Sequence, residues 1–167
     1  VVADGSSDPI DRFIDARRRD QGLVAVGAAD RVALLRRAHF DLIGLPPEPE
    51  EIARFVDDKS PNAFARRVDR LLASPRYGER WGRHWMDIWR YSDWYGSGAK
   101  EVRNSHRHMW RWRDWIVQSL NEDKSYGRMI EEMLAGDEIA PTDEKVLPAT
   151  GFLARNWYRF NRNVWMV

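Results

Sequence analysis

The chain has 167 residues, a formal net charge of +1 and no cysteine; 43% of its residues are hydrophobic and 32% are charged. This is the composition of a folded domain, and the lack of cysteine excludes disulfides, thiolate zinc sites, iron–sulfur clusters and covalently attached haem within these residues. Balanced charge argues against nucleic-acid binding, and no apolar run is long enough to span a bilayer. Because the chain does not begin with Met, we expect a trimmed or processed fragment of a longer protein.

Two features of the composition are unusual. Nine residues are Trp, and the 27 basic residues include only four Lys. Arginine stacks on aromatic rings and forms paired hydrogen bonds with carboxylates, which lysine does poorly. An arginine bias can equally reflect genomic base composition, so the pattern allows an aromatic, arginine-rich binding surface without requiring one.

The predicted elements are helices throughout. Residues 1–7 are small and polar and are expected to form a flexible arm, followed by a single helical domain over residues 8–167. Helix starts are indicated where a cap residue precedes proline, at Asp8-Pro9, Ser60-Pro61 and Ser74-Pro75. Apolar spacing of three and four residues predicts helices over 9–21, 30–42, 49–56, 61–72, 75–91, 106–120 and 125–135, with glycine stops at Gly22, Gly44 and Gly136.

The expected fold class is all-α, an irregular bundle of six or seven short helices with proline-marked joints. Period-two alternation is nowhere convincing, and residues 92–104 are predicted to form the longest loop. The helix faces expected to be buried carry Ile10, Phe13, Ile14, Val32, Leu35, Ala38, His39, Ile52, Phe55, Val56, Phe64, Val68, Leu71 and Leu72.

Residues 78–93 have the highest density of ionisable and aromatic side chains in the sequence. On a helix, Trp81, Trp85, Ile88 and Trp89 form one apolar edge, which we expect to be hidden between packed helices. A neighbouring edge carries ionisable and phenolic groups that would line a cleft, with His84 and Asp87 as candidate catalytic residues. The candidate cofactor-binding residues on and beside this edge are Arg80, His84, Arg90 and Tyr91.

Residues 103–115 interleave arginine with tryptophan, a pattern typical of cation–π contacts, of stacking on sugar faces, or of phosphate contact with base stacking. Arg111 and Arg113 are further cofactor-binding candidates. His106 and His108 are two residues apart, which suits a shared metal only in an extended segment. Asp137 and Glu138 form an acidic pair that either solvates a loop or binds a cation. Apart from these four weak candidates, no residues in the sequence have a recognisable metal-ligand spacing. We therefore expect the chain to bind no metal.

Several blocks of sequence together resemble a known family. They occupy nearly the whole chain, and their order makes the resemblance specific. The blocks are Asp8–Ile14, Ala29–Arg31, Asp41–Pro47, Val68–Pro75, Tyr77–Trp81, His84-Trp85, Trp112–Val117, Asn121–Lys124, Leu134–Glu138 and Ala149–Leu153.

These blocks resemble the cytochrome-c-associated domain of unknown function that is abundant in Planctomycetes and their relatives. The resemblance implies an exported, periplasmic or otherwise extracytoplasmic multidomain protein with a c-type cytochrome domain nearby. Members commonly continue into a Cys-x-x-Cys-His haem-attachment segment, which this cysteine-free chain does not contain, so the resemblance places haem c on an adjacent domain or segment. The family-motif residues at matching positions are Arg80, Trp81, His84, Trp85, Asp87, Arg90, Tyr91, Asp93, Arg113, Asp114, Asp137 and Glu138.

The sequence therefore suggests two possible functions. The first is a helical module that packs against a c-type cytochrome domain in a redox-linked activity, such as electron transfer, on an unidentified substrate. The alternative is a carbohydrate-binding module that places Trp rings on a polysaccharide and anchors it with Arg or Asp. Solvent-exposed, coplanar Trp rings would favour the second.

Overall fold

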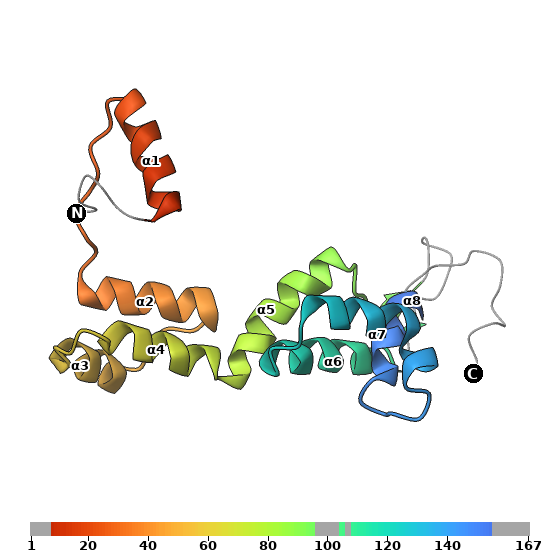
Figure 1. Cartoon of the computed structure of the whole chain (residues 1–167). Coiled ribbons are helices and arrows are strands. Elements are labelled where there is room, and N and C mark those ends of the chain that lie inside the picture. The colour runs from red at the N-terminus through yellow and green to blue at the C-terminus, as the bar shows by residue number, and fades with distance from the viewer. Residues whose placement is uncertain (1–7, 96–103, 106–107, 155–167) are drawn as a thin grey trace.

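A computed structural model of the chain describes residues 8–95, 104–105 and 108–154. This part of the protein is all-α, as predicted, and the expected arm at residues 1–7 lies outside it. The elements are α1 (Pro9–Asp20), α2 (Arg31–Leu42), α3 (Pro49–Asp57), α4 (Ala63–Leu72), α5 (Pro75–Ile88), α6 (Trp110–Asn121), α7 (Tyr126–Ile139), the 3-10 helix η1 (Leu147–Thr150) and α8 (Gly151–Ala154) (Figure 1).

The cap signals locate most helix starts correctly. The Asp8 side chain accepts a hydrogen bond from the Ile10 backbone N–H at 2.8 Å, and Asp30 caps α2 in the same way. The predicted start at Ser60-Pro61 is wrong, because α4 begins at Ala63. Pro61 and Asn62 instead form a turn, in which the Ala63 N–H donates to the Ser60 carbonyl at 3.1 Å, and the Asp58 carboxylate fixes Ser60 by accepting from its backbone N–H and its hydroxyl.

Helices α5 and α6 each end at a charged residue in a left-handed conformation rather than at a glycine. Helix α5 stops at Ile88 rather than at Tyr91, since Arg90 adopts a left-handed conformation (φ 57°) and the Tyr91 N–H donates to the Met86 carbonyl at 2.8 Å. Helix α6 closes in the same way with Asp123 (φ 51°). These are Schellman-type ends with a charged residue at the position that usually favours glycine.

Two other helix boundaries differ from the prediction. Helix α6 begins at Trp110 rather than at His106. Helix α7 bends at Ala135 (φ −146°, ψ 27°) and continues to Ile139, so Gly136 does not end it. Gly136 is buried instead, and a Cβ there would lie 3.3 Å from the Val146 side chain, which indicates that the glycine permits close packing of α7 on the segment that follows.

A short antiparallel ladder lies inside the predicted loop over residues 92–104. Strand β1 (Trp94–Tyr95) pairs with β2 (Asn104–Ser105), with Trp94 opposite Ser105. Two-residue strands are too short to leave an alternating pattern in the sequence, and for this reason the ladder was not predicted.

The buried side chains form two hydrophobic clusters. The N-terminal cluster joins α2, α3 and α4 and consists of Leu35, Phe55 and Ala63, flanked by Ile52 and Phe64. The C-terminal cluster joins α5, α6, α7, η1 and α8, and its buried members are Trp89, Met109, Trp112, Trp115, Ile116, Met129, Met133 and Ala149. The guanidinium of Arg31 stabilises the N-terminal cluster by donating hydrogen bonds to the backbone carbonyls of Phe55 and Asp58, at 2.6 and 2.7 Å.

The predicted burial of the α1 face is wrong. Phe13 is 80% exposed, and Ile10 and Ile14 are exposed as well. Helix α1 lies apart from the other helices in Figure 1, and it packs on no other element of the described part beyond an isolated contact. Val32, Leu72 and Ile88 were also expected to be buried and are exposed, since each lies at an edge of its helix that no neighbour covers.

His39 is a buried residue of α2, and its surroundings predict a pH effect on stability. Burial lowers the pKa of His39 below its usual value of 6.5; Glu51 opposes this shift with a carboxylate oxygen 3.9 Å from Nε2, and Arg67 adds to it. The folded state therefore binds the proton more weakly than the unfolded state, so stability falls as the pH drops below about 6.5.

The measurement is the urea midpoint of unfolding at a series of pH values between neutral and mildly acid. We expect His39→Gln to flatten the decline that the wild-type chain shows, and His84→Gln, at an exposed histidine, to leave that decline in place. An unchanged slope in His39→Gln would contradict the prediction.

Candidate functional site

The end of α5 and the start of α6 bring together four polar side chains, which we call the rim cluster: Tyr91, Asp93, Arg113 and Asp114. The Tyr91 hydroxyl donates to the Asp93 carboxylate. Arg113 donates to one carboxylate oxygen of Asp114 through Nε and Nη2, at 2.9 and 2.8 Å. Each pair joins residues that are close in sequence. The two pairs come from segments about twenty residues apart, and the fold brings them together.

The charges within the rim cluster shift two pKa values. Burial raises the pKa of the Tyr91 phenol, and the neighbouring Asp93 carboxylate raises it further, while Arg113 opposes the shift. The hydrogen bond to Asp114 raises the pKa of Arg113. Tyr91 is therefore a neutral hydrogen-bond donor at neutral pH, and the guanidinium of Arg113 stays charged.

A groove runs between α5 and α6 beside the rim cluster. Its volume is about 590 Å³, and Arg113 and Asp114 belong to its lining. Met86 and Val117 provide apolar surface. The remaining lining residues are polar or acidic: Glu79, Gln118, Asn121 and Glu122. A charged edge next to an apolar floor is the usual composition of a surface that binds another molecule.

Aromatic rings connect the rim cluster to the C-terminal cluster. The Tyr91 ring lies 5.7 Å from the ring of Trp112, which in turn lies 6.0 Å from Phe152, between ring centroids. On the other side of α5, Trp85 stacks on Trp89 at 5.0 Å and contacts Tyr126 at 5.3 Å. Tyr91 is thus the outermost ring of a series that leads into the core.

The tryptophan edge of α5 is only partly hidden. Trp89 is buried and Trp85 is half-buried, but Trp81 is 36% exposed. The face that packs on α6 is centred on Gly78 and Gly82 rather than on the three indoles. The prediction that all three indoles are hidden is therefore wrong for Trp81, because periodicity gave no indication that two glycines mark the closest approach.

The structure brings together only two of the predicted site residues. Tyr91 and Arg113 meet in the rim cluster. His84 is exposed and lies edge-on to Trp81, 5.4 Å between ring centroids. Arg111 lies over the ring of the exposed Trp110, one turn before the groove. The predicted line of ionisable groups along one helix does not reach Tyr91, since α5 ends at Ile88.

Arg80, another cofactor-binding candidate, packs against the turn that follows α2 instead. Its aliphatic stem lies against Gly44, where an added Cβ would be 2.9 Å from Arg80 Cδ. Gly44 also has a φ of 74°, so glycine is favoured there on both grounds. Asp87 and Arg90 are exposed at the end of α5 and do not belong to the rim cluster.

The metal-ligand candidates are spread over the chain. His106 lies outside the described residues, His108 is exposed in the turn before α6, and Asp137 and Glu138 are exposed in the last turn of α7. Within residues 8–95, 104–105 and 108–154, no three His, Cys, Asp or Glu side chains gather as a metal site would require.

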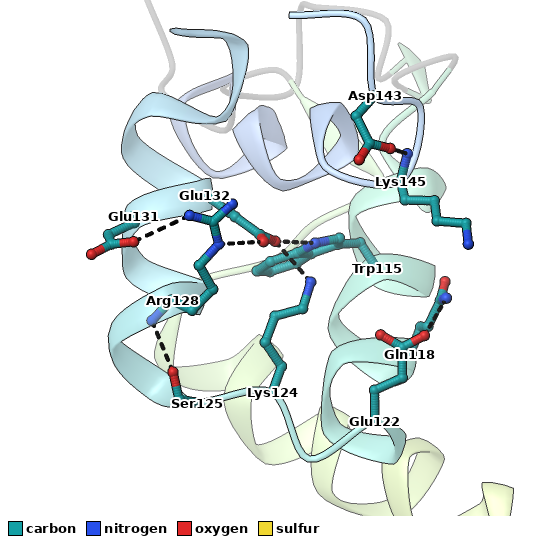
Figure 2. A network of polar contacts seen from close by, with 10 residues as sticks. All are labelled: Trp115, Gln118, Glu122, Lys124, Ser125, Arg128, Glu131, Glu132, Asp143 and Lys145. Atoms are coloured by element: carbon teal, nitrogen blue, oxygen red, sulfur yellow. Dashed lines mark hydrogen bonds and ion pairs between the residues drawn. The ribbon is translucent and has the colours of Figure 1, made fainter. Parts of the chain in front are cut away.

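One polar network was missed by the sequence analysis. Glu132 is 3% exposed and accepts hydrogen bonds from Trp115 Nε1 at 3.1 Å, from Lys124 Nζ at 2.8 Å and from Arg128 Nε at 2.9 Å (Figure 2). The Lys124 ammonium also lies 5.3 Å from the centre of the Trp115 ring. The four-residue spacing of Arg128 and Glu132 was the one signal available in the sequence. The network joins α6 to α7 and has a structural role.

Residues 9–165 match the PSCyt2 family, described as a protein of unknown function (DUF1549). The match covers nearly the whole chain, including both hydrophobic clusters and the rim cluster. The chain belongs to the PSCyt2 family. The name of the family points to an association with cytochromes. No curated protein and no solved structure matches the chain.

The PSCyt2 match covers every block on which the resemblance was based, apart from the first residue of the first block. None of the helices in the described part of this PSCyt2 chain is both long enough and apolar enough to cross a bilayer. Among the described residues outside the strands, the exposed indoles are those of Trp81 and Trp110, and they lie on different helices. Carbohydrate binding therefore stays a prediction without a specific structural observation in its favour.

Proposed function

We propose that this PSCyt2 chain is a helical module of an extracytoplasmic multidomain protein that docks on a c-type cytochrome domain and supports a redox-linked activity. The rim cluster beside the α5–α6 groove is the observation that carries the proposal. The cluster contributes Arg113 and Tyr91, the first ring of the series that leads inward, and the adjoining groove contributes apolar surface from Met86 and Val117.

The chemistry of a haem domain complements this surface. A c-type cytochrome exposes an apolar haem edge together with carboxylate groups, including the haem propionates. Arg113 already donates to Asp114 through Nε and Nη2, and its remaining N–H donors can bind a carboxylate of the partner. Arg111 lies two residues earlier, in the first turn of α6, where the positive end of the helix dipole adds to the attraction for anions. Met86 and Val117 provide apolar surface for the partner.

A redox role is supported by the position of Tyr91. Its phenol is hydrogen-bonded to the carboxylate of Asp93, and its ring contacts the ring of the buried Trp112. A partner docked on the rim cluster would therefore be in contact with the outermost ring of the series. The haem itself would belong to the partner, since this chain has no cysteine for its attachment.

The proposal is tested by titrating the chain with a purified single-haem c-type cytochrome and recording both the affinity and the haem midpoint potential. We expect binding with a Kd on the order of micromolar, together with a shift in the potential. Arg113→Ala should weaken binding about tenfold or more, the usual effect of losing a charge-assisted hydrogen bond. Arg83→Ala, at an exposed arginine of α5 outside the groove lining, should change it less than about twofold.

Two results would contradict the proposal. One is an unchanged potential with no detectable binding. The other is an equal loss of affinity in the Arg113 and Arg83 variants, which would indicate non-specific attraction between opposite charges. Heat released with glycans in the absence of any cytochrome binding would favour the carbohydrate alternative.

A further inference from the structure

Helix α1 carries an apolar face that no other element of the described chain covers. Ile10, Phe13 and Ile14 lie on this face, and all three are exposed. Leu23, just beyond the helix, is exposed as well, and it lines a groove of about 330 Å³ together with Phe13, Ile14, Arg17, Arg18 and Gln21. Residues three and four apart share one side of a helix, so Ile10, Phe13 and Ile14 form one apolar surface, and Arg17, four residues after Phe13, bounds it toward the C-terminus of α1.

Such a helix needs a packing partner to be stable. Isolated helices of 12 residues are marginal in water, and most helical stability in proteins comes from burying the apolar face. The ends of α1 are nevertheless fully specified, with the Asp8 cap, proline at the first helical position and three arginines in the last turn. The sequence therefore encodes a helix whose apolar face is to be covered from outside the described part.

We propose that this face is covered by the same face of a second copy of the chain, with the two α1 helices antiparallel. The charges on α1 favour this occupant. At 100° per residue, Asp11 and Arg18 lie on the same flank of the apolar face, one near each end of the helix. In an antiparallel pair related by a two-fold axis, like flanks face each other, so Asp11 of each copy lies opposite Arg18 of the other.

The register that this pairing sets also satisfies the apolar residues. The two-fold axis passes between Ile14 and Asp15, so Phe13 and Ile14 of both copies meet at the centre. Ile10 of each copy then faces the C-terminal half of the other helix, where the groove beside Leu23 can receive it. Arg18 already donates to Asp15 of its own chain at 3.1 Å, and a guanidinium has enough donors to bridge two carboxylates.

The size of the surface sets the strength of the pairing. About four apolar side chains per copy form a smaller interface than the roughly 800 Å² per partner of a standard stable complex. The dimer is therefore weak, with a dissociation constant on the order of tens of micromolar. It forms only at high local concentration, and it does not depend on the proposed cytochrome docking.

The test is analytical ultracentrifugation of the purified chain from about tenfold below to about tenfold above that constant. We expect a concentration-dependent dimer, which Phe13→Asp abolishes without changing the unfolding midpoint, because Phe13 is 80% exposed in the described part of the chain. Leu134→Asp, at an exposed leucine of α7, is the matched control and should leave the dimer intact.

Charge reversal tests the antiparallel register. Asp11→Arg and Arg18→Asp should each weaken the dimer, and the double variant should restore it. A monomer at every concentration would overturn the proposal, as would a dimer that survives Phe13→Asp or a double variant that fails to recover. A chain that stays monomeric but binds vesicles of anionic lipid through Phe13 would also overturn it and assign the face to a membrane surface instead.

Discussion

Glu132→Ala is expected to lower the free energy of unfolding by about 3 kcal/mol. The substitution leaves the indole N–H of buried Trp115 without its acceptor, which alone costs about 1–3 kcal/mol. It also leaves Lys124 and Arg128 without their shared carboxylate. Both cations retain some access to water, so the cost stays well below that of stranding a fully buried charge.

The measurement is urea unfolding followed by tryptophan fluorescence and circular dichroism. Glu131→Ala is the control, since Glu131 is 63% exposed and makes one long contact with Arg128 at 3.4 Å. We expect that control to lose less than about 0.5 kcal/mol. Glu132→Gln should fall between the two, because the amide oxygen can still accept from Trp115. Equal losses at positions 131 and 132 would contradict the structural role of the network.

The same carboxylate predicts a dependence on pH. Burial by itself would raise the pKa of Glu132, but hydrogen bonds from Lys124 and Arg128 outweigh it, and the net shift is downward from 4.5. The folded state thus binds the proton more weakly than the unfolded state. The stabilising contribution is fully present above about pH 4.5 and is lost as the pH falls through the lower folded-state pKa. Glu132→Gln should remove this part of the acid sensitivity.

Gly78→Ala is expected to destabilise the chain by about 2–3 kcal/mol although alanine is the better helix former. The added Cβ would lie 2.4 Å from the Val117 carbonyl oxygen and 2.7 Å from the Asn121 side chain, so backbone must move. The hydrogen bond from the Gly78 N–H to Asn121 Oδ1, now 2.8 Å, would be strained as well. These costs exceed the gain of about 1 kcal/mol in helix propensity.

Gly82→Ala provides a matched control on the same helix face. Its Cβ would lie 3.2 Å from a methyl group of Val117, which can shift by a few tenths of an ångström. The cost of this clash and the gain in helix propensity then nearly cancel. We expect the free energy of unfolding to change by less than about 1 kcal/mol. Thermal unfolding of both variants decides the matter. A Gly78 variant as stable as the Gly82 variant would show that α5 and α6 do not approach as closely as the structure indicates.

The all-α class and most helix starts could be predicted from local chemistry. Asp8, Asp30 and Ser125 cap helices as their residue types suggest, because a cap depends on only two or three neighbouring residues. The ends set by Arg90 and Asp123 could not be predicted in this way, since a left-handed conformation at a charged residue is imposed by tertiary packing.

The candidate site was predictable only in part, for a related reason. Tyr91 and Arg113 were candidates from composition and from the family blocks, but nothing in their spacing indicated that the two segments meet. Periodicity identifies which residues share a side of one helix, and it carries no information on which side faces which neighbour. The same limit explains why α1 was expected to be covered and why Gly78, not Trp81, marks the contact with α6.

The order in which the helices pack bears on how the polypeptide acquires its structure during synthesis. Helices α2, α3 and α4 complete one cluster before any residue of α5 is needed, and α5 to α8 complete the other from consecutive segments. Each cluster is therefore built from elements that follow one another along the chain, a topology that favours rapid folding. The nascent chain can bury its first apolar residues while the second half is still being synthesised. This shortens the time for which apolar surface is exposed to other nascent chains.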